Sequence, residues 1–442
     1  MRLLQKTLVT STVTVACCIA HSQQQVRPPK INLWMDVSTS SFAGMPDIES
    51  MGGSSLLGGL VGTATGGAGL GGALKTYGQA RSFSMMPSRV IDIALLNTSK
   101  PAVEVSQAIP ASMKMGASLP LVPPVKTESI RREERDELPQ NMERPKGRIL
   151  IYWGCSETVR SGQPRIINLA GDMTKFGNAF SGRYAPDRSV RVSDKHAIYP
   201  NDKNTVNLSK DSSIAGEHQI IGDGIPASMR FSLSQAQDIM PAIALQSSGN
   251  PASSIKLNWQ SLSQAKAYFI SAFSSNGNDM VLWSSSESAD AGMGLMDYLP
   301  NATIDNWLRD RVLLQPSTTS CAVPQGIFAA KDGGHDSGAM AQMIAFGGES
   351  YIVYPPRPTD VKTPWNQEWA VRLRLKSQTM ASLGGEDNAR SNRRATPMSN
   401  NTNSDNAPPS QNVQTDAPAD GGGLLGLPIP GVGGLLKGLF GR

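Results

Sequence analysis

Alternation of apolar and polar residues recurs along most of this chain and predicts a series of short β-strands. The cleanest case is residues 369–377, WAVRLRLKS, where every second residue is apolar and Arg372, Arg374 and Lys376 stand between. The pattern predicts that the apolar residues face a core and that the three cations face outward. The residues expected to face the core are Trp369, Val371, Leu373 and Leu375. Further strands are expected at residues 31–39, 89–97, 165–169, 188–193, 218–222, 229–234, 280–286, 340–346 and 351–354.

The strongest single strand signal is GRILIYWGCSE, from Gly147 to Glu157. Ile149 to Trp153 form a continuous apolar run between turn formers, which is typical of a strand buried on both faces. Cys155 follows directly at the end of that run.

Composition supports a β protein with long loops. The chain has 442 residues, of which 39% are hydrophobic and 17% charged, and it contains 43 Gly and 30 Pro. We therefore expect a mainly β fold with two or three β-sandwich-like domains, long loops and disordered ends. The expected divisions are a signal peptide (1–22), a β region (23–125), a charged linker (126–146), a β domain (147–248), a second sandwich (249–382), a disordered tail (383–423) and an apolar docking peptide (424–442).

One stretch resembles the first half of a fibronectin type III sandwich. Ile255, Leu257 and Trp259 alternate, a polar turn follows, and a second strand opens at Tyr268. The resemblance implies immunoglobulin- or fibronectin III-like sandwiches, in which two sheets face each other with the Trp in their core. The chain departs from that family at residues 297–311, where a helical turn is expected.

The N-terminus predicts export. Residues 1–22 combine a basic start, an apolar core and a small-x-small site ending at Ser22, as in a secretory signal. Cys17 leaves lipidation open as the alternative. Cleavage removes Arg2 and Lys6 and so lowers the formal charge of +5 by two, which is too weak a charge to indicate a nucleic-acid partner.

Cys155 and Cys321 are the two cysteines expected to remain after export, because Cys17 and Cys18 lie in the signal. An exported chain with two cysteines favours one disulfide between them. Two buried thiols are the alternative interpretation.

Residues 50–74 contain no charged residue, and Gly58, Gly62 and Gly66 recur in them at four-residue spacing. The spacing resembles glycine-zipper segments, which implies a membrane-associating helix with close helix contacts. A flexible Gly-rich loop joining two strands is the favoured interpretation and the membrane-associating helix the alternative, because Gly disfavours helices by about 1 kcal/mol per position relative to Ala.

Two other features suggest docking. The cations Arg372, Arg374 and Lys376 would suit an anionic surface, or they would guard a sheet edge against pairing. The last residues, 424–442, are apolar and cationic and follow a polar tail, which predicts contact with a membrane, a partner or the protein itself.

Catalytic signatures are weak. We expect no cofactor, no metal site and no assigned catalytic residue, because the three histidines beyond the signal are not at metal-ligand spacing. The Gly-rich loop GGHDSGAM brings His335 and Asp336 together and is the one loop candidate for chemistry. A polar surface hairpin is the alternative.

The segments YWGC (152–155), VLWSSSE (281–287) and YPPRP with a later PW (354–365) resemble a group of exported bacterial envelope proteins without assigned function. The resemblance implies a periplasmic or envelope location. We therefore expect a non-enzymatic envelope protein that binds or scaffolds, with an envelope protein, a glycan or a membrane surface as partner. A periplasmic hydrolase of envelope polysaccharide and a membrane-active secreted protein are the alternatives.

Overall fold

Strands predominate in the structure, a computed structural model. It describes residues 24–43, 77–82, 87–125, 147–169, 182–329 without 277 and 293, and 339–384. The described strands form sheets of nine, four, three and two strands. This confirms the mainly β, sandwich-like fold class.

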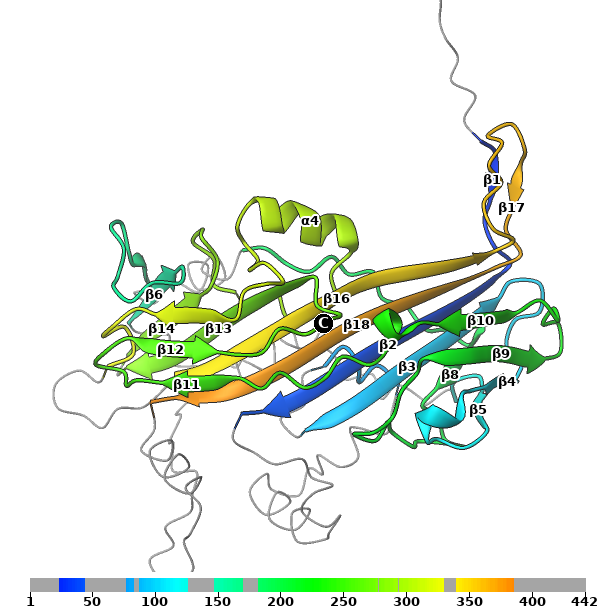
Figure 1. The fold of residues 1–442 in the computed structure, drawn as a ribbon, viewed down its shortest axis with the longest axis horizontal. Helices are drawn as coiled ribbons and strands as arrows, with labels where there is room; N and C mark the ends of the chain where they lie inside the picture. Colours follow the sequence, from blue (N-terminus) through cyan, green and yellow to red (C-terminus); the bar gives the residue numbers. More distant parts are fainter. Residues whose placement is uncertain are drawn as a thin grey trace, which may run out of the picture. The chain divides into compact units, whose positions relative to one another are not determined.

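The nine-stranded sheet is the centre of the fold (Figure 1). Its neighbours pair antiparallel except for two parallel pairs, β14 with β6 and β18 with β2. In spatial order its strands are β7 (Arg165–Asn168), β6 (Arg148–Trp153), β14 (Asp279–Ser284), β13 (Ala267–Asn276), β16 (Ala339–Tyr354), β18 (Trp369–Leu383), β2 (Ile31–Phe42), β3 (Ser88–Asn97) and β8 (His196–Tyr199).

Smaller elements surround this sheet. The four-stranded sheet has the order β10 (Arg230–Leu233), β9 (Gly216–Gly222), β4 (Val105–Ala108) and β5 (Ser118–Leu121). The three-stranded sheet has the order β11 (Gln246–Ser248), β12 (Ile255–Asn258) and β15 (Ser320–Val323), and β1 (Val26–Arg27) pairs with β17 (Trp365–Asn366). The described helical elements are α4 (Asn301–Arg309) and the short 3₁₀ turns η2 (Ala111–Met113) and η3 (Gln235–Gln237).

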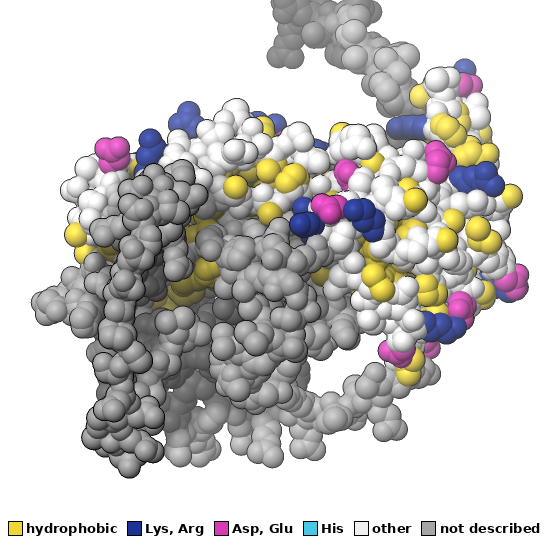
Figure 2. Space-filling model, turned by 60° about the horizontal axis from the view of Figure 1, so that its bottom comes forward, with side chains coloured by type: hydrophobic (Ala, Val, Ile, Leu, Met, Phe, Trp, Pro, Cys, Tyr) yellow, Lys and Arg dark blue, Asp and Glu magenta, His cyan; other side chains and the backbone are white. Residues whose placement is uncertain are grey.

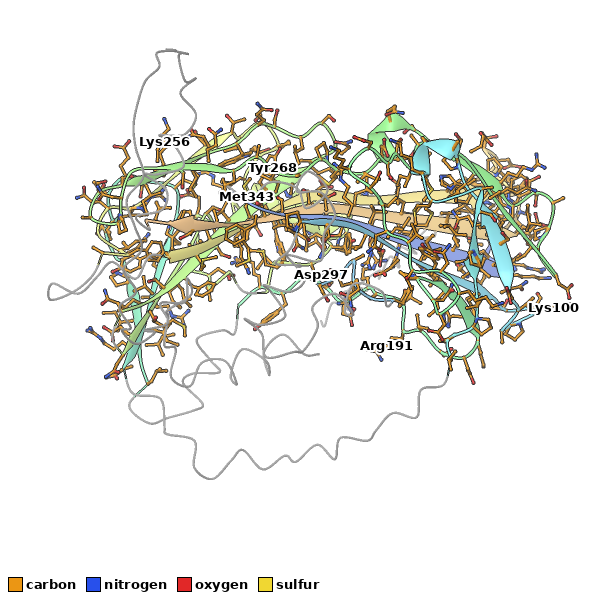
Figure 3. The ribbon with its side chains drawn as sticks, turned by 90° about the horizontal axis from the view of Figure 1, so that it is seen from below. Lys100, Arg191, Lys256, Tyr268, Asp297 and Met343 are labelled. Carbon is orange, nitrogen blue, oxygen red and sulfur yellow. A yellow bond between two sulfur atoms is a disulfide. The ribbon has the colours of Figure 1, made fainter. Side chains whose placement is uncertain are left out.

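The first face of the large sheet is apolar. Leu33, Ile93 and Leu373 point to it and belong to one buried cluster with residues of the four- and three-stranded sheets, such as Ile220 and Leu257. Figure 3 shows the arrangement from the side, with Tyr268 and Met343 on this face and Asp297 on the other. The nine-stranded sheet on one side and the four- and three-stranded sheets on the other thus enclose the main core, as alternation with period two requires.

The second face is covered by α4 and by chain segments without regular strands. Near α4 it is apolar, because Phe269 and Phe346 of the sheet pack with Ile304 of the helix. Further along, it carries charged side chains, which form the candidate site described below.

A bulge in β16 changes which residues face which side. The pairing of β16 with β18 shifts between Phe346 and Gly348. Gly348 has φ +75°, and a Cβ there would lie 2.3 Å from Oδ1 of Asn301, so only glycine suits this position. Asn301, the first residue of α4, also donates to the carbonyl of Glu349 at 2.8 Å and accepts from its N–H at 3.0 Å. The bulge therefore fastens the helix to the sheet and directs Glu349 to the second face.

Several expectations need correction. The boundaries drawn at residues 125, 147 and 249 do not separate sheets, because the regions on either side all contribute strands to the nine-stranded sheet. The strands expected at 340–346 and 351–354 are one strand, β16, interrupted only by its bulge. Residues 188–193, expected as a strand, lie outside regular structure because their partners are side chains of the sheet rather than a neighbouring backbone.

Other expectations are confirmed, or they concern residues that the structure does not describe. The helix expected within 297–311 is α4, and the strand at 149–153 is β6, whose Ile149, Leu150 and Ile151 are buried as predicted. Among the described residues, no helix is long and apolar enough to span a membrane. The signal peptide, Gly58, Gly62, Gly66, the charged linker, His335, Asp336 and the chain from residue 385 onward lie outside the described residues.

Candidate functional site

A row of charged side chains crosses four strands of the second face. Strand pairing places Glu349 of β16 opposite Arg374 of β18, Arg374 opposite Asp36 of β2, and Asp36 opposite Asp92 of β3. All four are buried, at 6%, 2%, 4% and 3% exposure in that order. Four ionisable groups side by side in a protein interior are unusual, because each loses its hydration there.

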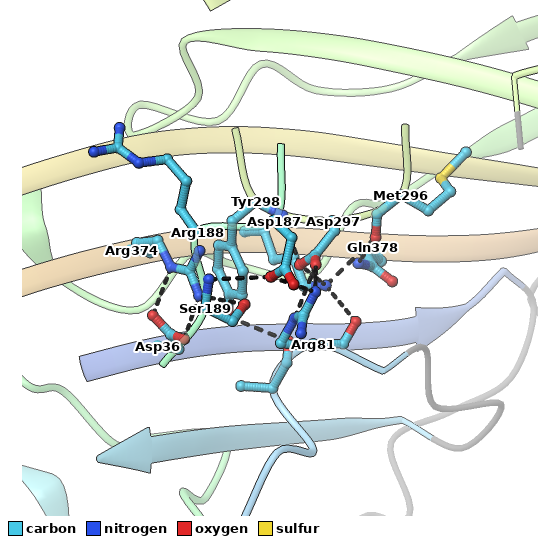
Figure 4. Close-up of polar contacts among 12 residues, drawn as sticks. Asp36, Arg81, Asp187, Arg188, Ser189, Met296, Asp297, Tyr298, Arg374 and Gln378 are labelled. Carbon is cyan, nitrogen blue, oxygen red and sulfur yellow. Dashed lines mark hydrogen bonds and ion pairs between the residues drawn. The ribbon is translucent and has the colours of Figure 1, made fainter. Parts of the chain in front are cut away.

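Arg374 and Asp36 form the centre of this row (Figure 4). The guanidinium donates two parallel hydrogen bonds to the carboxylate, Nε to Oδ1 at 2.7 Å and Nη2 to Oδ2. It also lies 4.5 Å from the centroid of the Tyr298 ring, at cation–π distance. Burial on its own would lower the pKa of Arg374, but the hydrogen bonds and the negative charge of Asp36 outweigh it and raise that pKa.

Lys376 lies one row further along the same face and is 1% exposed. Its Nζ donates to the carbonyl of Arg81 at 2.9 Å and lies 3.7 Å from the carboxylate of Asp297 and 4.8 Å from the Tyr298 ring centroid. Burial lowers its pKa to about 8, although the charge of Asp297 acts in the opposite direction. Cations from two rows of the sheet thus lie at cation–π distance from one aromatic ring.

The segment 77–82 is pinned to the sheet by these groups. Asp92 accepts a hydrogen bond from the N–H of Ala80 at 2.8 Å, and the Tyr298 hydroxyl donates to the carbonyl of Ala80 at 3.2 Å. The side chain of Arg81 binds Asp297 through Nε at 2.9 Å and Nη2 at 2.8 Å. Burial raises the pKa of Asp92 to about 7, while hydrogen bonds from the backbone of this segment act against the rise.

A second covering segment, residues 182–193, is held in the same way. Arg372 donates through Nη1 to the carbonyl of Arg188 at 2.8 Å, and Arg374 Nη2 lies 3.4 Å from Oγ of Ser189. Arg188 in turn lies 3.5 Å from the carboxylate of Glu349. Burial, followed by the nearby charge of Arg374, lowers the pKa of Arg372.

The expectation that Arg372, Arg374 and Lys376 face outward is therefore wrong. Their exposures are 8%, 2% and 1%, so they do not offer an anionic surface contact in this structure. The alternation itself was interpreted correctly, since these residues do share the face opposite Leu373. The second face is covered, however, by segments far away in sequence, and the carboxylates of Asp36 and Asp297 neutralise Arg374 and Lys376 there.

Several of the groups that complete the site were not singled out from the sequence. Asp36 and Asp92 are isolated acids within apolar strands, and this pattern is the signal that could have marked them as buried and paired. Tyr298, Arg81 and Asp297 carry no such signal, because they lie in loops whose position depends on the tertiary fold.

The expected disulfide is present. Cys155, directly after β6, is bonded to Cys321 of β15, with 5.0 Å between their Cα atoms. The bond ties the three-stranded sheet on the first face to the β6 side of the large sheet.

The ionisable groups that the strands contribute to the site are buried and are covered by other parts of the chain. Asp36 and Asp92 resemble the carboxylate pairs of acid–base sites, in which one acid stays protonated near neutral pH. Tyr298, 3% exposed, and the segment 77–82 lie over them, however, and the ionised groups are engaged with one another. Within the described residues, no group of three or more His, Cys, Asp or Glu side chains is arranged to hold a metal ion.

No family model matches this chain, and neither a curated protein nor a solved structure is similar to it.

Proposed function

We propose that the protein is a non-enzymatic, exported component of a cell envelope that acts by binding or scaffolding. The observation that carries the proposal is the use of the buried charges of the second face. Arg372, Arg374, Lys376 and Asp92 each bond to the backbone or side chains of a covering segment. Groups used in this way make a rigid body, which suits a protein that presents surfaces to partners.

Two further observations support the envelope location. A disulfide such as Cys155–Cys321 forms and persists in oxidising compartments, to which secreted and periplasmic proteins belong. The N-terminal sequence has the order of a secretory signal, and three segments resemble exported bacterial envelope proteins. The partners of this proposal are an envelope protein, a glycan or a membrane surface.

Fractionation of producing cells combined with thiol trapping tests the proposal. Cells are treated with an alkylating reagent before lysis, and the envelope fraction is washed with alkaline carbonate. We expect the protein in the periplasmic or envelope fractions with Cys155 and Cys321 unavailable to the reagent until a reductant is added. Protein in the cytosol with both thiols alkylated would contradict the proposal.

One observation favours a second candidate, a hydrolase of envelope polysaccharide. Asp36 and Asp92 are paired across neighbouring strands, and the pKa of Asp92 is raised to about 7 by burial. Paired carboxyl groups of which one is protonated are the usual equipment of glycosidases. Release of dye from labelled peptidoglycan by the wild type, lost in Asp92→Asn, would replace the binding role by this one. We expect no release from either protein.

A further inference from the structure

An arm of the molecule carries exposed apolar side chains together with cations. We define the arm as residues 24–30 and 351–368, which include β1, the end of β16, β17 and the loop between β16 and β17. Four of the ten exposed large apolar side chains of the described residues lie in this small region: Val26 at 48%, Tyr351 at 54%, Tyr354 at 40% and Val361 at 54%. Tyr351 is the register partner of Arg372 and its hydroxyl donates to Glu349, so it lies on the second face, whereas Tyr354 is the partner of Trp369 on the first. Val26, Tyr354 and Val361 are therefore the exposed apolar side chains that suit a common site of contact.

The arm is held together by its own contacts. The ring of Tyr354 stacks on Trp369, with 5.4 Å between centroids and 10° between planes. Trp365 donates through Nε1 to the carbonyl of Pro355 at 2.9 Å, and Arg357 lies 5.7 Å above its ring. The exposed side chains are therefore displayed on an ordered support.

The N-terminal strand completes the arm. Gln24 donates to the carbonyl of Thr363 at 2.9 Å and accepts from Nε of Arg357 at 2.8 Å. Val26 is the register partner of Trp365 in the parallel pairing of β1 with β17. The two segments of the arm, more than 300 residues apart in sequence, are thus joined to each other.

The charge of the arm is positive. It contains Arg27, Lys30, Arg357 and Lys362, all exposed, and only two acids. Those two are already engaged, since Asp360 accepts from the N–H of Lys362 at 2.9 Å and Glu368 accepts from Ser228 at 2.7 Å. Among the described residues, none of the four cations forms an ion pair. Figure 2 shows basic, hydrophobic and a few acidic side chains close together at this end of the molecule.

We propose that the arm binds the surface of an anionic phospholipid bilayer, with Val26, Tyr354 and Val361 entering the headgroup region and Lys30 and Lys362 contacting lipid phosphates. Tyr and Trp prefer the membrane interface because their rings are apolar and their tips are polar. Basic residues near an anionic leaflet add to the attraction, and the combination of both kinds of side chain gives interfacial binding without a membrane span. This inference rests on the proposed envelope function and assigns its membrane contact.

Sedimentation of the purified full-length protein with vesicles tests the arm. Vesicles of phosphatidylcholine with one quarter phosphatidylglycerol are compared with pure phosphatidylcholine at 0.1 M salt. We expect binding to the anionic vesicles only, and at least about a 10-fold loss of affinity in Lys30→Glu/Lys362→Glu. The matched control Lys195→Glu/Lys256→Glu reverses two exposed lysines outside the arm and so makes the same change in net charge. Its affinity for the vesicles is expected to fall only by the effect of that change in net charge, to within about 2-fold.

The apolar contribution is tested separately with one position. Val361→Asp is expected to weaken binding about 10-fold, whereas Val206→Asp, at a valine of similar exposure outside the arm, leaves it unchanged. Val361→Trp is expected to tighten binding, a gain that loss of folding does not produce.

Two results would overturn the inference. If the arm variants bind as their controls do, the membrane contact lies elsewhere in the chain. If the wild type does not sediment with anionic vesicles, the arm has no such role. In either case the proposed function stands as long as the protein still fractionates with the envelope, so the two failures are distinguishable.

Discussion

The two faces of the nine-stranded sheet are stabilised in different ways, although they are formed by the same strands. Leu373 and Arg374 are neighbours in β18 and are both buried, at 1% and 2% exposure. Leu373 packs in the apolar cluster of the first face, whereas Arg374 binds Asp36 and lies beneath Tyr298 on the second. The first face depends on packing, which tolerates changes of similar volume. At its centre the second face depends on the Arg374–Asp36 pair, in which loss of one partner leaves a buried charge uncompensated.

The largest effect is expected from removing one partner on the second face. Asp36→Ala leaves the Arg374 guanidinium buried without its counter-charge, which typically costs about 3–5 kcal/mol of unfolding free energy. Chemical denaturation measures the loss. It should persist in 0.5 M salt, because salt screens buried pairs only weakly. Glu104→Ala breaks the exposed pair with Lys203 and serves as the control, with an expected loss of about 0–1 kcal/mol.

The second substitution separates charge from shape at the same position. If an unpaired charge causes the loss, Arg374→Met in the Asp36→Ala background should restore part of the stability. A further loss in the double variant would mean that the aliphatic stem and packing of Arg374, rather than its charge, hold this face together.

A smaller effect is expected on the first face. Leu373→Ala removes a buried side chain from the main cluster and typically costs about 2–5 kcal/mol, depending on how far the neighbours close the cavity. Leu373→Met, which nearly keeps the volume, should cost less than about 1.5 kcal/mol. If Leu373→Ala and Leu373→Met both lowered the unfolding free energy as much as Asp36→Ala does, the distinction between the two faces would not hold.

The comparison also shows what the sequence could predict. Alternation in 369–377 correctly predicts which residues share a face, because it is set by the local geometry of a strand. It does not predict whether the second face is open to water. That depends on segments such as 77–82 and 182–193, whose contacts with β18 span 184 to 295 residues.

The sheet itself illustrates the same limit. The strands at 31–39 and 369–377 were both expected, but their parallel pairing over twelve residues follows from no local pattern. The disulfide was predictable because Cys155 and Cys321 are the two cysteines outside the expected signal peptide. Asp36 and Asp92 lie in strands that were predicted, and their place in the site became visible only when pairing brought them next to Arg374.

The last effect concerns how the unfolding free energy depends on pH, to which groups of the second face contribute. An aspartate in an unfolded chain ionises near pH 4, whereas Asp92 in the folded protein keeps its proton up to about pH 7. Between these values the folded state binds more protons than the unfolded state, so this group lowers the unfolding free energy as pH rises. The contribution of Lys376 to the unfolding free energy changes with the opposite sign and does so at higher pH. Because its pKa in the folded protein is about 8, below the ordinary value of 10.5, this contribution rises with pH between those two values.

The substitution Asp92→Asn isolates the contribution of Asp92 to the pH dependence of the unfolding free energy. The variant keeps an oxygen that can accept from the N–H of Ala80 but cannot ionise. Relative to the wild type, we expect it to gain about 2–4 kcal/mol of unfolding free energy between pH 4.5 and pH 7.5, as measured by denaturation at several pH values. Asp223→Asn, at an exposed carboxylate paired with Lys100, should give a curve parallel to the wild type. Parallel curves for both variants would mean that Asp92 ionises as an ordinary aspartate, and that water reaches the second face beneath residues 77–82.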